Sequence, residues 1–286
     1  MKLKRLMMCA VLAVGTVLAA GCGEDDGANK PREIKGFTGN VEDVSPKAGD
    51  LVATFEFESY GTIKAVLFPE AAPVGVDNFR KLCDSGYYEG LTVHRVMKDF
   101  MFQGGSLNGD GTGGDALVEN GSFGIETAQN ARHFYGALCY ANAGGQNSTQ
   151  FYIVNEKNPT DTAEIAENYN AIAGQYRDAA KQYADAGIQD GADYFNSYAD
   201  SFQVTVDWMN AATDAIKARY NEKGGAAFLD GGYTVFGQVY EGFDVIDSIS
   251  AAEVKHVDES DEESELSVPV QPIIIKNVYV SEYVEG

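Results

Sequence analysis

Residues 93–105 read Val93-His94-Arg95-Val96-Met97-Lys98-Asp99-Phe100-Met101-Phe102-Gln103-Gly104-Gly105. Apolar side chains dominate two short runs in this stretch, and they predict β-strands over 91–97 and 100–103. The pair His94-Arg95 carries no information by itself, because such a pair usually belongs to a protein surface or to a buried histidine with its partners in place. Whether the stretch forms a site depends on the sequence around it.

The sequence on both sides predicts a fold built mainly from short strands. Helical spacing of apolar residues appears over 74–84 and 243–249. Many short strands with Gly-rich turns and a few helices predict a mainly β fold, a closed antiparallel β-barrel with capping helices. The other predicted strands are rich in β-branched and aromatic residues and lie at 51–58, 62–68, 137–141, 150–154, 234–240 and 272–280.

A helical segment interrupts this pattern. Apolar residues recur every three or four positions over 161–187, and a second helical run follows over 195–220. Asp161 with Glu164 resembles a capping box at the start of the first helix. The simplest interpretation is an antiparallel helical hairpin over 156–224. Tyr169, Tyr176 and Tyr183 form a tyrosine stripe along the first helix. The stripe packs the first helix against the second, or alternatively Trp208 and exposed tyrosines form an arm that contacts unfolded clients.

The first 21 residues are typical of an export signal. Lys2, Lys4 and Arg5 precede an apolar run that is too short to span a bilayer comfortably, which takes about 20 residues. The run ends in Leu18-Ala19-Ala20-Gly21-Cys22, which resembles a lipoprotein processing site and makes Cys22 the candidate lipidation site. The alternative is an ordinary cleaved signal with an accidental cysteine. The polar residues 22–48 are predicted to be a flexible tether.

Charge and cysteine content limit the partners. The chain carries a net charge of −22, and losing the basic signal segment would make it more negative still. Such a field repels nucleic acid and anionic headgroups, so a lipid anchor would have to hold the protein at a membrane. Cys83 and Cys139 are predicted to be buried free thiols, although an exported protein could pair them. No spacing resembles a metal site, and we expect a monomer.

Three ordered groups of motifs resemble those of the cyclophilins. The first comprises Asn78-Phe79, Gly86-Tyr87-Tyr88, Gly90, His94-Arg95-Val96, Phe100-Met101, Gln103-Gly104-Gly105 and Gly111-Thr112-Gly113-Gly114. The second comprises residues 137–143 and 148–153, and the third residues 229–237. The resemblance covers about 50–155 and 226–281. It implies a cyclophilin-like barrel, interrupted by the hairpin, with its first part over 49–155 and its second over 225–286.

The resemblance implies peptidyl-prolyl cis-trans isomerase activity on proline-containing peptides and unfolded exported proteins. Rotation of the X-Pro amide meets a barrier of about 18–20 kcal/mol, at the top of which the nitrogen lone pair localises. Catalysis needs a hydrogen-bond donor aimed at that nitrogen and a dry pocket for the ring, and no cofactor. Arginine suits the first task because it is always charged and carries several donors.

Carried over by motif position, Arg95 and Gln103 are the candidate catalytic residues. The resemblance assigns substrate binding to His94, Phe100, Met101, Ala141, Asn142, Ala143, Gln150, Phe151, Phe228, Leu229 and Tyr233. Phe228 and Tyr233 stand where many eukaryotic relatives have tryptophan and histidine, which puts cyclosporin binding in doubt but not activity. The alternative function is a holdase or peptide-binding module with little isomerase activity.

Two further features are expected to be structural. His133 precedes Phe134-Tyr135-Gly136 and is interpreted as a structural residue. The acidic run 258–265 is interpreted as a solvated loop, because it lacks the ligand spacing of a calcium loop. A lipid-anchored, extracytoplasmic enzyme at the bacterial cell membrane is the localisation that the N-terminal segment predicts.

Overall fold

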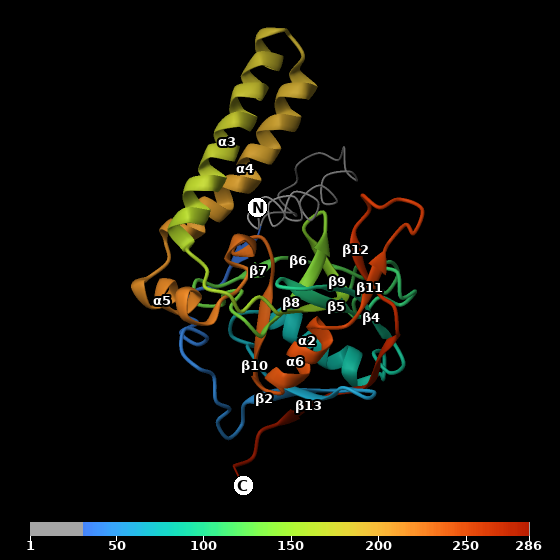
Figure 1. Cartoon of the computed structure of the whole chain (residues 1–286). Helices are drawn as coiled ribbons and strands as arrows, with labels where there is room; N and C mark the ends of the chain where they lie inside the picture. The colour runs from blue at the N-terminus through green and yellow to red at the C-terminus, as the bar shows by residue number, and fades with distance from the viewer. Residues whose placement is uncertain (1–30, 286) are drawn as a thin grey trace.

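The computed structural model describes residues 31–285 and shows a closed antiparallel β-barrel (Figure 1). The barrel strands follow the order β5-β4-β13-β2-β3-β10-β8-β9, and β5 pairs with β9 to close the ring; β6 adds to the far side of β9. This confirms the predicted mainly β fold. The strands are β2 Leu51–Phe57, β3 Gly61–Leu67, β4 Thr92–Met97, β5 Met101–Gly104, β6 Phe123–Gly124, β8 Ala137–Ala143, β9 Gln146–Val154, β10 Val235–Glu241 and β13 Ile273–Glu282.

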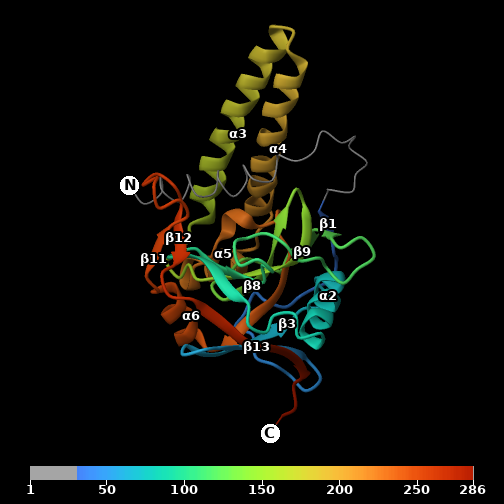
Figure 2. The ribbon, with the colours of Figure 1, turned by 90° about the vertical axis from the view of Figure 1, so that its right-hand side faces the viewer.

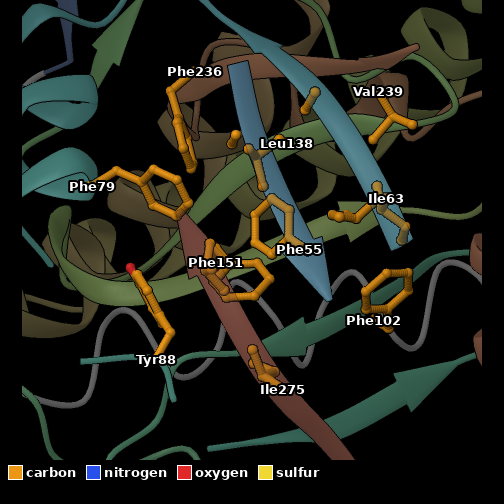
Figure 3. Close-up of a cluster of buried hydrophobic side chains, with 14 of the residues drawn as sticks. Phe55, Ile63, Phe79, Tyr88, Phe102, Leu138, Phe151, Phe236, Val239 and Ile275 are labelled. Atoms are coloured by element: carbon orange, nitrogen blue, oxygen red, sulfur yellow. The ribbon is translucent and has the colours of Figure 1, made fainter. Parts of the chain in front are cut away.

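Two helices cap the barrel and complete its core. Helix α2, Pro73–Asp84, and helix α6, Phe243–Ser250, each bury one apolar face against the strands. Their side chains join a cluster of aromatic rings from the barrel interior (Figure 3). Phe55 lies near its centre, with ring centroids 5.8 Å from Phe79 and 5.1 Å from Phe151. Successive side chains of a strand point to opposite faces of the sheet, and the residues on the inner face make up this set.

The inserted segment forms a long helical hairpin that projects away from the barrel (Figures 1 and 2). Helix α3, Thr162–Asp185, packs along helix α4, Gln189–Asn210. The tyrosine stripe packs between the two helices: Tyr169 lies 5.4 Å from Phe202, and Tyr176 lies 5.3 Å from Tyr198. The second run is not one helix, because Thr213 caps a separate helix, α5 Asp214–Lys223.

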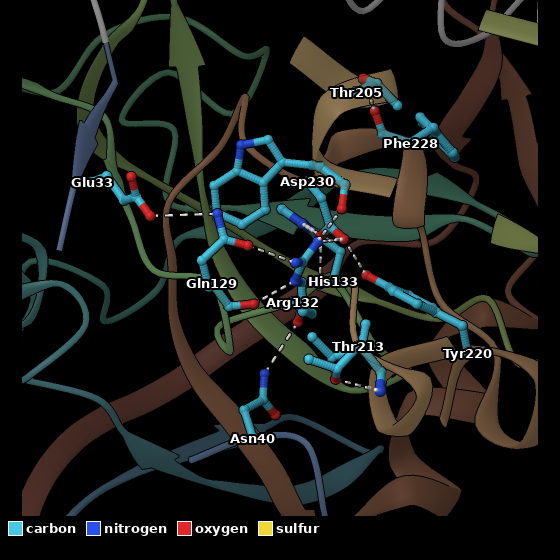
Figure 4. Close-up of polar contacts among 12 residues, drawn as sticks. Glu33, Asn40, Gln129, Arg132, His133, Thr205, Thr213, Tyr220, Phe228 and Asp230 are labelled. Atoms are coloured by element: carbon cyan, nitrogen blue, oxygen red, sulfur yellow. Dashed lines mark hydrogen bonds and ion pairs between the residues drawn. The ribbon is translucent and has the colours of Figure 1, made fainter. Parts of the chain in front are cut away.

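A buried ion pair fastens the base of the hairpin to the barrel (Figure 4). Arg132 and Asp230 have fully buried side chains, and Arg132 Nη1 lies 3.1 Å from Asp230 Oδ2. The same carboxylate accepts hydrogen bonds from Tyr220 of α5 and from the backbone N–H of His133, and it lies 2.8 Å from His133 Nδ1. Trp208 of α4 stacks on the Arg132 guanidinium. His133 therefore has the structural role expected of it, and Trp208 belongs to the base of the hairpin.

Residues 31–48 differ from the predicted flexible tether. Strand β1, Arg32–Glu33, pairs in parallel with β7, Glu126–Thr127, and the Asn40 side chain donates to the Arg132 carbonyl. The ring of Phe37 lies 4.9 Å from that of Phe68. These contacts hold 31–48 against the barrel. The predicted signal peptide and the anchor Cys22 lie outside the described residues.

The acidic run 258–265 is a loop whose residues 258–263 are exposed, as expected of a solvated loop. It connects β11, Val254–His256, to β12, Leu266–Pro269, and the two strands pair in antiparallel fashion beside β4. Cys83 and Cys139 are buried free thiols, as predicted. Within 31–285, no helix is long and apolar enough to cross a bilayer, and no group of three or more His, Cys, Asp or Glu residues could hold a metal ion.

Replacing Asp230 with Ala should destabilise the protein by about 3–5 kcal/mol, because it leaves the buried charge of Arg132 without its partner. Chemical denaturation would measure this change. Asp43→Ala is the matched control, since the Asp43–Arg219 pair is exposed on the carboxylate side and should contribute less than about 1 kcal/mol. Equal losses in the two variants would contradict the assigned role of Asp230.

Candidate functional site

A pocket of about 650 Å³ opens on the outer side of β4 and β5. Its wall combines an arginine, a glutamine and an asparagine with aromatic and aliphatic side chains, a composition suited to an amphipathic ligand. Nine of the residues predicted from the sequence line it: His94, Arg95, Phe100, Met101, Gln103, Ala141, Asn142, Leu229 and Tyr233.

Strand register brings the two candidate catalytic residues together. A tight turn joins β4 to β5, with Asp99 in the left-handed region at φ 57°, which Asp tolerates better than most residues. Arg95 then pairs with Gln103 across the two strands. Arg95 Nη1 lies 3.5 Å from Gln103 Oε1, at the limit of a hydrogen bond. Arg95 thus keeps most of its donor capacity on this side for a ligand.

Gln103 is held in turn by Gln150. The Gln103 amide donates to Gln150 Oε1 at 2.9 Å, and the Gln150 amide donates to the Gly111 carbonyl at 2.9 Å. Gln150 does not line the pocket; it holds the orientation of Gln103 against the glycine-rich loop. Ala143 lies exposed near the end of β8, also outside the pocket wall.

Phe151 does not line the pocket. Its side chain is fully buried in the barrel core, beside Phe55 and Tyr88 (Figure 3). Successive residues of a strand point to opposite faces, so the next residue, Tyr152, faces the pocket and lines it. Tyr152 pairs with Gln103 across β5 and β9. The aromatic wall assigned to Phe151 therefore belongs to Tyr152.

Phe228 supports the pocket from behind. It lies on the short helix η1, Ala227–Leu229, with its ring 5.4 Å from that of the pocket residue Phe100. Thr205 of α4 donates to the Phe228 carbonyl at 3.0 Å. The hairpin base therefore fixes the segment that places Leu229 in the pocket wall.

The sequence interpretation missed Glu265, which pairs with Arg95. The Nε and Nη2 donors of Arg95 lie 2.7 and 2.6 Å from the two carboxylate oxygens, and both side chains are 23% exposed. Burial alone would raise the pKa of Glu265, but the hydrogen bonds and charge of Arg95 outweigh it and hold that pKa below its ordinary value. The carboxylate therefore stays ionised at neutral pH.

No sequence signal assigned Glu265 to the site. The two partners lie 170 positions apart, and the residue ends a run of acids that resembles any solvated loop. Strand β12, which begins directly after Glu265, buries only Ser267 among its first three residues, so the usual burial of the apolar positions does not mark it.

His94 lines the pocket as a neutral imidazole. Burial, together with the charge of Arg95, lowers its pKa to about 4. Neither of its ring nitrogens has a hydrogen-bond partner among the described residues. His94 therefore contributes shape to the wall and no charge near pH 7.

Comparison with known proteins gives a consistent result at the level of family. The family model described as cyclophilin type peptidyl-prolyl cis-trans isomerase/CLD matches residues 52–174 and 210–280. A Staphylococcus aureus (strain USA300) protein named "Putative peptidyl-prolyl cis-trans isomerase" is 33% identical over 223 residues, which cover 78% of this chain and 88% of that protein. A Staphylococcus epidermidis protein of the same name is also 33% identical over the same shares.

Solved structures show the same fold. The crystal structure of a Cryptosporidium parvum cyclophilin type peptidyl-prolyl cis-trans isomerase aligns with a TM-score of 0.50 and 18% identity, covering 82% of this chain and 99% of that one. A second structure of that protein, obtained in the presence of the dipeptide Ala-Pro, aligns with a TM-score of 0.50 and 19% identity, over 81% of this chain.

His94 should titrate with a midpoint near pH 4 in an NMR experiment that follows its ring carbons. Between its ordinary value of 6.5 and about 4, the unfolded chain binds a proton at this residue and the folded chain does not. Stability should therefore fall as the pH drops through that window, and His94→Gln should reduce the slope. A midpoint near 6.5 would contradict the desolvated position of His94.

Proposed function

This chain belongs to the cyclophilin-type peptidyl-prolyl cis-trans isomerases, and we propose that it accelerates X-Pro rotation in exported or surface proteins and so assists their folding. Uncatalysed X-Pro isomerisation takes tens to hundreds of seconds, which makes it a slow step for any chain that must fold around a proline. The observation that carries the proposal is the placement of Arg95 and Gln103 in the same pocket as an apolar surface formed by Phe100, Met101 and Leu229.

In this proposal the pocket separates two tasks. Phe100, Met101 and Leu229 provide a dry surface for the proline ring, with Tyr152 and Tyr233 closing the wall. Arg95 directs N–H donors to the amide nitrogen as its lone pair localises, an interaction that is stronger in the transition state than in either ground state. The Asn142 backbone holds the substrate chain beside the pocket.

The alternative is a holdase that binds proline-containing segments without catalysing their rotation. Binding alone needs the apolar wall but has no use for an arginine that Glu265 holds by two donors and that faces Gln103 with a third. This arrangement favours the enzyme.

Arg95→Ala should lower kcat/KM for an X-Pro test peptide by about 100-fold or more, since it removes the donor for the transition state. A protease-coupled or NMR exchange assay would measure the rate. Lys98→Ala removes an exposed cation from the adjacent turn and should leave the rate unchanged. Equal rates for wild type and Arg95→Ala, or no activity in the wild type, would leave the holdase as the better account.

The proposed location depends on Cys22. Lipidation of this residue would tether the enzyme outside the cytoplasm, where exported chains fold. The support is the apolar segment that ends in Leu18-Ala19-Ala20-Gly21-Cys22.

Cys22→Ala should move the protein from the membrane fraction to the soluble or secreted fraction of bacterial cells, because a lipid chain is then no longer attached. Immunoblots of fractionated cells would show the change. Cys9→Ala, within the same apolar segment, is the control and should leave the protein at the membrane. Membrane retention of the Cys22 variant would contradict the anchor.

A further inference from the structure

The acidic flap, which we define as residues 254–269, forms one side of the pocket. It consists of β11, β12 and the loop between them, and β12 lies against β4, the strand that carries Arg95. Six of its residues line the pocket: Val257, Glu263, Ser264, Glu265, Ser267 and Val268. The flap is therefore part of the site rather than a neighbouring surface loop.

Glu265 grips one edge of the Arg95 guanidinium. The carboxylate accepts from Nε and Nη2 in the paired geometry that gives arginine–carboxylate contacts their directionality. Ser267 fixes the carboxylate in turn, since its hydroxyl donates to Glu265 Oε1 at 2.6 Å. The backbone N–H of Val257 donates to the Glu265 carbonyl at 2.8 Å, and this bond does not depend on the side chain.

The number of N–H donors that remain free on Arg95 determines whether it can still bind a substrate while it is paired with Glu265. A guanidinium carries five N–H groups; Glu265 takes one on Nε and one on Nη2, and Gln103 faces Nη1. Donors therefore remain on Nη1 and Nη2, at the end of the fork that Glu265 does not cover. The contact orients the guanidinium and leaves it able to donate to a substrate.

We propose that Glu265 is a positioning residue for isomerisation: it fixes the plane of the Arg95 guanidinium so that its free donors meet the amide nitrogen of the substrate. This inference rests on the proposed function. Glu265, fixed by Ser267, then holds Arg95 from the flap, while Gln103, fixed by Gln150, faces Nη1 from the barrel at 3.5 Å. A long side chain fixed in this way needs no reorganisation at the moment of reaction.

The experiment compares Glu265→Ala and Glu265→Gln with wild type, with Glu262→Gln as the matched control. Glu262 is an exposed acid of the same flap that does not line the pocket. In Glu265→Ala, kcat should fall about ten- to a hundredfold while KM changes by less than about twofold, because misplacement affects the transition state more than substrate binding. Glu265→Gln keeps one acceptor oxygen and should lie between, and Ser267→Ala should cause a smaller loss of the same kind.

A second readout reports on Arg95 directly. The NMR signal of the Arg95 Nε–H should shift and broaden in Glu265→Ala and stay in place in Glu262→Gln. Circular dichroism and the unfolding midpoint confirm that each variant is folded; should Glu265→Ala fail this check, Glu265→Gln and Ser267→Ala carry the test.

Several results would overturn the proposal. These are an unchanged kcat in the Glu265 variants, a loss confined to KM, or an equal loss in Glu262→Gln. A rise in kcat in the Glu265 variants would instead mean that Glu265 inhibits Arg95 in the wild type. Failure of this inference alone appears as activity lost in Arg95→Ala and kept in Glu265→Ala, whereas activity kept in Arg95→Ala contradicts the proposed function itself.

Discussion

Strand β5 packs into the barrel core with one face and lines the pocket with the other. Its register therefore determines the arrangement of the site. Phe102 and Gly104 point into the barrel, where Phe102 is fully buried in the aromatic core. Met101 and Gln103 point the other way and line the pocket. Because the side-chain period of a strand is two residues, a slip of one position would exchange core and pocket at once. The core packing of Phe102 therefore keeps Gln103 opposite Arg95.

The local structure was readable from the sequence, because it depends on local patterns. The strand predicted over 51–58 is β2, the helix predicted over 74–84 is α2, and Asp161 caps α3 as its spacing indicated. A motif does not tell which residue of a strand faces the pocket. For that reason the pocket wall was assigned to Phe151, although its neighbour Tyr152 forms it. Contacts between distant segments left no local trace: the pairing of β1 with β7 and the Glu265–Arg95 ion pair each join residues far apart in sequence.

The base of the hairpin and its far end differ in their relation to the barrel. Its base shares the Arg132–Asp230 pair with the barrel, and the rings of Tyr152 and Tyr233 lie 6.2 and 6.4 Å from His133 in the same cluster. Its far end, by contrast, lies within 175–209, the part that the family model does not match. The distal hairpin contributes no residue to the pocket wall, whereas Trp208 and Tyr220 belong to the support of the site.

The place of β13 in the sheet has a consequence for how the chain is made. This last strand lies between β2 and β4, near the start of the barrel. A polypeptide emerging from its N-terminus onward cannot close the ring until residues 273–282 are free of the ribosome, and contacts of such long sequence separation form slowly. The nascent chain therefore spends its synthesis with β2 and β4 lacking their common neighbour. Because β13 pairs with both β2 and β4, the strand that carries Arg95 gains its second neighbour only when β13 joins the sheet.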